Sequence, residues 1–157
     1  MTKVTWTVLG SLVALGGGFA LSVAADQKPG QILPYDVPEA VAAGEAIYGE
    51  YCASCHAADL SGEPNWRTPK DTGRLPAPPH DETGHTWHHP DIQLFMLTKY
   101  GTAAVVGNGY ESDMPGFEGQ LSDQQILEVL AYIKSTWSDR IIARHDEMNA
   151  AVAAQAQ

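Results

Sequence analysis

The only two cysteines of the chain lie within one five-residue stretch, Cys-Ala-Ser-Cys-His, at residues 52–56. Three chemistries use two cysteines at this spacing. A thioredoxin-like dithiol follows a strand, a zinc site needs a fourth ligand besides Cys52, Cys55 and His56, and Cys-x-x-Cys-His is the attachment signature of a c-type haem. A helical pattern, not a β pattern, precedes the motif. The motif therefore favours a covalent haem over the dithiol and zinc alternatives.

Three segments have the pattern of helices. The first begins near Pro38 and runs into the cysteines, and the second lies between Pro90, suited to a first turn, and Gly101, suited to a position after the last turn. The third begins with a capping box of Ser122 and Gln125. It carries one apolar stripe of Ile126, Val129, Leu130, Ile133 and Trp137.

Two long segments between these helices lack periodicity, at residues 57–88 and 101–120. An irregular loop of such length is uncommon inside a small domain unless it has a function. About three helices also make a thin protein core for a chain of 157 residues. A large apolar cofactor would fill the space that the helices leave.

The N-terminal residues 1–25 indicate export. No charge occurs between Lys3 and Asp26, and the uncharged segment 4–25 fits either a signal peptide cleaved before Asp26 or a retained membrane anchor. Both alternatives predict a periplasmic domain, either free or anchored in the inner membrane.

Three further regions follow the N-terminal segment. Residues 26–37 contain two prolines and a glycine and are predicted to be a linker. Residues 38–139 form the predicted domain, and residues 140–157 a tail that is helical at first and frayed at its end. The chain has 9 basic and 19 acidic side chains, a formal charge of −10, which argues against a nucleic-acid partner and fits a solvated acidic surface or a basic protein partner.

Four methionines are candidates for a sixth iron ligand. Met1 begins the chain, Met148 lies in the polar tail, and Met96 is expected in the core. Met114 lies in a loop before the third helix, where Pro115 would stiffen the backbone. Met114 is therefore the predicted ligand.

The order of these features resembles that of class I, mitochondrial-type cytochromes c over residues 37–137. The resemblance implies an all-α cytochrome c fold, with about three main helices and long loops around one covalent haem. Cys52 and Cys55 would form the thioether bonds, His56 would be the proximal ligand and Met114 the distal one.

The resemblance assigns further roles. The Pro64 carbonyl would accept a hydrogen bond from the second ring nitrogen of His56. The helix crossing of the family is matched by Gly44 and Tyr48 on the first helix and by Val129 and Tyr132 on the last.

The segment from Asn65 to Pro90 departs from the family because it is longer and richer in histidine. It contains His80, His85, His88 and His89. One hypothesis is a second metal site, for example for copper. The other is a wall of the haem site, in which Arg74, Trp87 and some of the histidines would bind the haem propionates.

An iron bound by both histidine and methionine has no vacant position for a substrate. The resemblance thus implies a one-electron carrier that is not an enzyme and exchanges electrons with redox protein partners. Two alternatives are a haem enzyme or gas sensor with a labile distal ligand, and a haem-containing or metal-handling subunit that uses the histidine-rich loop at residues 80–89.

Overall fold

A computed structural model describes residues 28–156 of the chain, and within that range the regular structure is helical with no strand. The expectation of an all-α protein is therefore confirmed. The predicted signal peptide or anchor lies outside the described residues. The helices are α1 (Pro38–Tyr51), α2 (Ala53–His56), the 3₁₀ helix η1 (Thr86–His88), α3 (Asp91–Tyr100), α4 (Thr102–Val106), α5 (Asp123–Ser135) and α6 (Asp139–Gln155).

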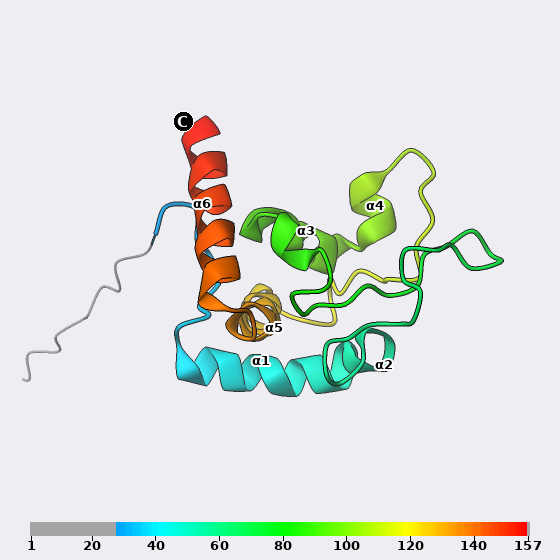
Figure 1. The fold of residues 1–157 in the computed structure, drawn as a ribbon, viewed down its shortest axis with the longest axis horizontal. Helices are drawn as coiled ribbons and strands as arrows, with labels where there is room; N and C mark the ends of the chain where they lie inside the picture. Colours follow the sequence, from blue (N-terminus) through cyan, green and yellow to red (C-terminus); the bar gives the residue numbers. More distant parts are fainter. Residues whose placement is uncertain (1–27, 157) are drawn as a thin grey trace, which may run out of the picture.

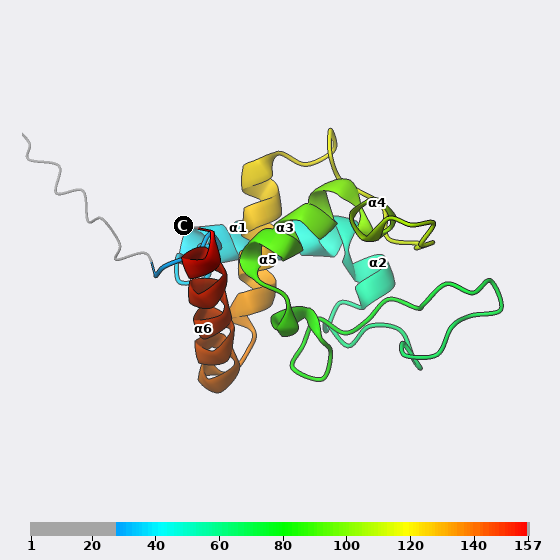
Figure 2. The same cartoon turned by 90° about the horizontal axis from the view of Figure 1, so that it is seen from above.

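Helices α1 and α5 form the most extensive helix contact, and they cross each other near their middles (Figures 1 and 2). The crossing depends on Gly44, because a Cβ atom there would lie 2.0 Å from the Glu128 carbonyl oxygen. Beside this contact the rings of Tyr48 and Tyr132 pack with their centroids 5.5 Å apart. The predicted crossing of the first and last helices of the domain is confirmed.

The start of α5 has the predicted capping box. The Ser122 side chain accepts from the Gln125 N–H, and the Gln125 side chain accepts from the Ser122 N–H at 3.0 Å. This arrangement satisfies two donors that an uncapped helix would leave unpaired. All members of the predicted stripe are buried, namely Ile126, Val129, Leu130, Ile133 and Trp137.

Helix α3 ends at Tyr100 and is followed by Gly101, whose positive φ of 84° glycine adopts without strain. The chain then forms the short helix α4 inside the segment 101–120 that was predicted to be a loop. Five residues are too few for a helical period to stand out in a sequence. Met96 was expected in the core but is 38% exposed on α3.

The predicted linker is packed on the domain from residue 28 onward. Leu33 is only 1% exposed, and the Asp91 carboxylate accepts from the N–H groups of Ile32 and Leu33 at 2.9 and 3.2 Å. The linker prediction is wrong for residues 28–37, because the domain buries the Leu33 side chain and accepts hydrogen bonds from the backbone beside it.

The predicted fraying of the C-terminal tail is also wrong. Helix α6 continues to Gln155 and buries Ile141, His145, Asp146 and Asn149. Figure 1 shows α6 standing beside the start of the described chain. Among residues 28–156 we find no helix with the length and apolar character needed to cross a membrane.

A buried polar cluster of Asp91, Lys134, His145, Asp146 and Asn149 joins the outer segments to the domain. Lys134 is fully buried, and its Nζ lies 2.6 Å from Asp146 Oδ1. Burial favours a raised pKa for Asp146, but the hydrogen bonds from Lys134 and Lys28 outweigh it and lower this pKa below its usual value. The backbone N–H of Asp91 donates to Asn149 Oδ1 at 2.8 Å. The cluster thus ties α3, α5 and α6 together.

We expect Gly44→Ala to lower the free energy of unfolding by about 3 kcal/mol, because the added methyl group meets rigid backbone of α5. Urea denaturation of the purified protein measures this. Gly49→Ala is the matched control on the same helix, since nothing lies within 4 Å of its added Cβ. It should stabilise the protein slightly, by about 0.5–1 kcal/mol. Equal effects of the two variants would show that α1 and α5 do not depend on this close approach.

We expect Lys134→Met to destabilise the protein by about 3–5 kcal/mol, because it removes the buried lysine beside the Asp91 carboxylate and leaves Asp146 with Lys28 as its lysine partner. Lys99→Met is the control: its Nζ lies at a similar distance, 2.7 Å, from Asp123, whose side chain is 63% exposed. Loss of this pair should cost less than about 1 kcal/mol, because the carboxylate that remains is solvated. Denaturant midpoints compare the two, and a small effect at Lys134 would contradict the assigned importance of the cluster.

Candidate functional site

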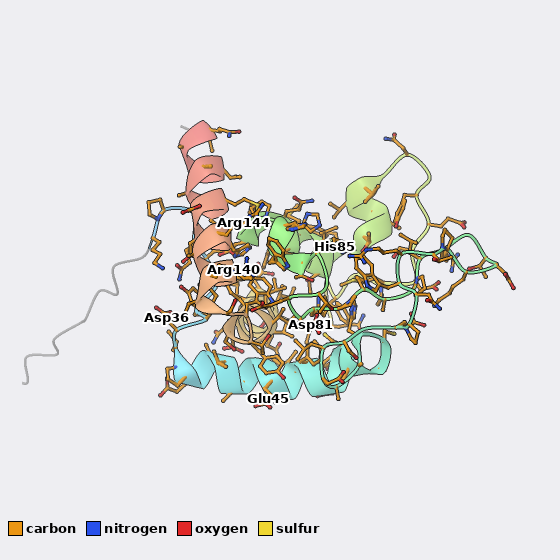
Figure 3. The ribbon with its side chains drawn as sticks, viewed as in Figure 1. Asp36, Glu45, Asp81, His85, Arg140 and Arg144 are labelled. Carbon is orange, nitrogen blue, oxygen red and sulfur yellow. The ribbon has the colours of Figure 1, made fainter. Side chains whose placement is uncertain are left out.

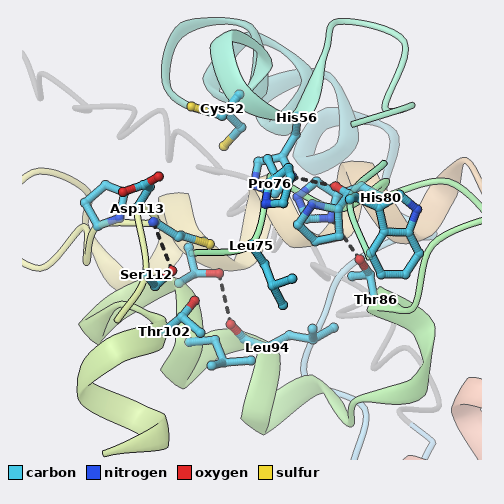
Figure 4. A pocket seen from close by; sticks show the side chains of 18 of the residues that line it. Cys52, His56, Leu75, Pro76, His80, Thr86, Leu94, Thr102, Ser112 and Asp113 are labelled. Atoms are coloured by element: carbon cyan, nitrogen blue, oxygen red, sulfur yellow. Dashed lines mark hydrogen bonds between the residues drawn. The ribbon is translucent and has the colours of Figure 1, made fainter. Parts of the chain in front are cut away.

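A cavity of about 590 Å³ lies between the end of α1, helices α3 and α4, and the two long loops. Figure 4 shows Cys52 and His56 on one side of it and Leu94 and Thr102 on the other. Most of the side chains around it are apolar. The sequence analysis predicted such an apolar space, because the few helices of the chain leave the interior of the domain unfilled.

The short helix α2 presents the cysteine motif to this cavity. The N–H groups of Cys55 and His56 both donate to the Cys52 carbonyl, at 3.1 and 2.9 Å. This turn places positions three and four residues apart on one helix face, and Cys52, Cys55 and His56 all line the cavity. The Tyr48 hydroxyl donates to the Ala57 carbonyl at 3.0 Å and fixes the end of the turn.

The structure weakens two of the three chemistries that the sequence left open, the reactive dithiol and the zinc site. Both cysteines are free, and burial raises the pKa of Cys52 to about 11, whereas a reactive dithiol needs a lowered thiol pKa. Within residues 28–156 no three side chains of His, Cys, Asp or Glu are grouped to hold a metal ion. The zinc alternative and the hypothesis of a second metal site therefore have no preformed ligand set in the described chain.

The ring of His56 is held in one tautomer. Its Nδ1 lies 2.8 Å from the Pro78 carbonyl oxygen, and since a carbonyl can only accept, Nδ1 carries the proton. Burial lowers the pKa of His56, while the bond to Pro78 acts in the opposite direction. A neutral ring of this form keeps a lone pair on Nε2, which is what a metal ligand requires.

The prediction that Pro64 supplies this carbonyl is wrong. The chain turns away from His56 and returns to it, because the Gly62 N–H donates to the His56 carbonyl and the Glu63 N–H to the Ala77 carbonyl, both at 2.9 Å. Pro64 is exposed beyond that point. The part of the loop that returns to α2 brings Pro78 to the His56 ring instead.

Met114 lines the cavity and is partly buried. Its N–H donates to the Ser112 hydroxyl at 3.1 Å. The adjacent Asp113 pairs with Arg74 at 2.7 Å, so this ion pair joins the Met114 loop to the other long loop. Arg74 itself does not line the cavity, contrary to its predicted role as a propionate partner.

The histidine-rich loop divides between the cavity and the surface. His80, His85 and His89 line the cavity, and His88 does not. The side chain that accompanies them is Trp66, whose ring stacks on that of His85 with centroids 5.2 Å apart. The sequence analysis missed Trp66, and an aromatic residue in an aperiodic loop offers no period from which to find it.

Trp87 lines a separate hollow of about 370 Å³, where the Arg144 guanidinium lies 5.3 Å from the centre of its ring. Figure 3 shows Arg144 on α6. Its Nε1 donates to the Glu82 carbonyl at 3.3 Å. Trp87 therefore does not line the cavity, and its predicted role beside the haem does not hold.

The residues around the cavity fit a c-type haem. Two free thiols, an imidazole lone pair and a thioether open onto one apolar space. In addition, Nδ1 of His85 is buried in the wall with no hydrogen-bond partner in the described residues. Such a wall suits a large apolar ring that also carries polar groups.

The cytochrome c family model matches residues 41–137 of the chain. This range begins within α1, contains the cysteine motif, Met114 and helices α2 to α5, and ends before α6. No curated protein and no solved structure matches the chain.

Proposed function

Because the chain belongs to the cytochrome c family, in which a covalent haem transfers electrons, we propose that it carries single electrons on a haem whose iron is bound by His56 and Met114. One observation carries this proposal. The lone pair of His56, the sulfur of Met114 and both thiols belong to side chains that line the same cavity. With both axial positions taken, the iron has no vacant site for a substrate, so the protein acts as a carrier and not as an enzyme.

Cys52 and Cys55 would hold the haem by thioether bonds to its two vinyl groups. When bound, the haem supplies reversible one-electron exchange, and histidine–methionine ligation raises its reduction potential. The hydrogen bond from His56 to Pro78 supports this role, because it fixes the tautomer and makes the ligand ring more basic. The apolar lining excludes water from the iron, which limits rearrangement of solvent when the charge changes.

We also propose that the domain works outside the cytoplasm, in the periplasm, where it meets a redox donor and acceptor. The support is the uncharged segment 4–25 that follows Lys3. If this segment is retained as an anchor, residues 28–37 do not act as a flexible tether, because they pack on α3 through Asp91. The domain would then stay close to the membrane.

The visible spectrum of the oxidised protein tests the axial ligation. We expect the wild type to show the weak far-red band of methionine bound to ferric iron, and Met114→Ala to lose it while keeping its haem. Met96→Ala is the control, since Met96 lies exposed on α3 and does not line the cavity, and it should keep the band. A wild type without the band would overturn methionine ligation and favour an open site or a histidine ligand.

The mass of the unfolded protein tests the attachment. We expect haem to stay on the chain after denaturation of the wild type and of Cys52→Ala or Cys55→Ala, each of which keeps one thioether bond. The double variant should release it, because only coordination and packing remain. Ser54→Ala, between the two cysteines, is the control and should retain haem like the wild type. Retention by the double variant would contradict the assignment of the two thiols.

A further inference from the structure

A second histidine ring lies flat against the ring of His56. The centroids of the His56 and His80 rings are 3.9 Å apart, and their planes differ by 25°. Both side chains line the cavity, and Figure 4 shows them next to each other, with Thr86 beside His80. The His56 ring therefore has a contact on its face in addition to the hydrogen bond at its edge.

His80 is itself held on several sides. Its Nδ1 lies 2.9 Å from the Thr86 hydroxyl oxygen, which also lies 3.4 Å from the Pro79 carbonyl oxygen. The backbone N–H of His80 donates to the Leu60 carbonyl at 2.8 Å. Its own carbonyl accepts from Trp137 Nε1 at 2.8 Å. A ring fixed in this way resists displacement by its neighbour.

One turn of the chain supplies both contacts to His56. Pro78 provides the carbonyl at the ring edge, and His80, two residues later, provides the stacked face. The turn closes tightly at Gly84, where a Cβ atom would lie 2.0 Å from the Pro79 carbonyl oxygen. The two contacts are therefore part of one rigid unit.

We propose that His80 is a positioning residue for the iron ligand His56, which it holds in one rotation about the Cβ–Cγ bond. The inference rests on the proposed function, because it concerns a ring that binds iron. A hydrogen bond to Nδ1 directs one edge of the ring but allows the ring to tilt about that bond. A flat neighbour at stacking distance opposes this tilt, and the two contacts together define the plane of the ligand.

Proton NMR of the ferric, haem-loaded protein reads this plane directly. The direction of the ligand ring sets how unpaired spin spreads over the haem, and hence the pattern of the shifted haem methyl signals. We expect His80→Phe to keep the wild-type pattern, because it keeps a flat ring. His80→Leu, which fills the space without a flat face, should redistribute the methyl shifts. It should also raise the ferrous-to-ferric ratio severalfold at a fixed mediator potential, because a tilted ring bonds less well to Pro78 and is a less basic ligand.

His88→Leu is the matched control, because His88 belongs to the same loop but is exposed and does not line the cavity. It should leave the methyl pattern and the ratio unchanged. An unchanged pattern in His80→Leu would overturn the inference, even if that variant were less stable. If His80→Leu yields no folded protein, His80→Gln decides, because its amide can still bond to the Thr86 hydroxyl but it has no aromatic ring. It should shift the pattern in the same sense, and no shift would overturn the inference.

The same spectra separate this inference from the proposed function. Wild-type protein with a labelled histidine ring should show strongly shifted signals from His56, as expected for an iron ligand. Their absence would count against His56 as the ligand. Their presence, together with an unchanged pattern in His80→Leu or His80→Gln, would count against the positioning role alone.

Discussion

The hydrogen bond from His56 to the Pro78 carbonyl joins the two halves of the site. One partner belongs to a helical turn at the end of α1, and the other to a loop that returns after 22 residues. The bond selects the tautomer that leaves Nε2 free, so ligand chemistry depends on where the loop returns. It also brings His80 onto the face of the same ring. A single backbone carbonyl thus links the course of the long loop to the tautomer of the His56 ring.

Two further segments pack on this domain, and both lie outside the range that matches the cytochrome c family. Residues 28–37 and α6 flank the matched segment on both sides. They are joined to it by buried charges, above all Lys134 with Asp146. A buried pair contributes little net stability, yet removing one partner is costly. The arrangement therefore fixes where the outer segments dock more than it strengthens the fold.

Local patterns predicted what local forces determine. The capping box at Ser122 and the turn that carries Cys52 and His56 depend on neighbours a few residues away. The close approach of Gly44 to Glu128 is long-range, and it was predicted from the family resemblance. The register of an aperiodic loop has no such signal, and so Pro64 was chosen where Pro78 is the partner. Arg74 and Trp87 were assigned to the haem propionates by residue type alone. In the structure Arg74 pairs with Asp113, and Trp87 packs against Arg144.

The ion pairs between the loop residues around the cavity are too weak to order these loops. Arg74 with Asp113 and Lys70 with Glu63 are both partly exposed, and such pairs contribute about 0–1 kcal/mol each. Fixing the backbone of a single residue costs about 1–2 kcal/mol. Beyond the contacts at Pro78 and His80, the buried Leu60 and the hydrogen bond between Glu63 and Ala77 hold the base of segment 57–88. The side chains that face the cavity still need a group to pack against. A covalently attached apolar group is well suited to that task, since it fills the cavity and cannot dissociate from it.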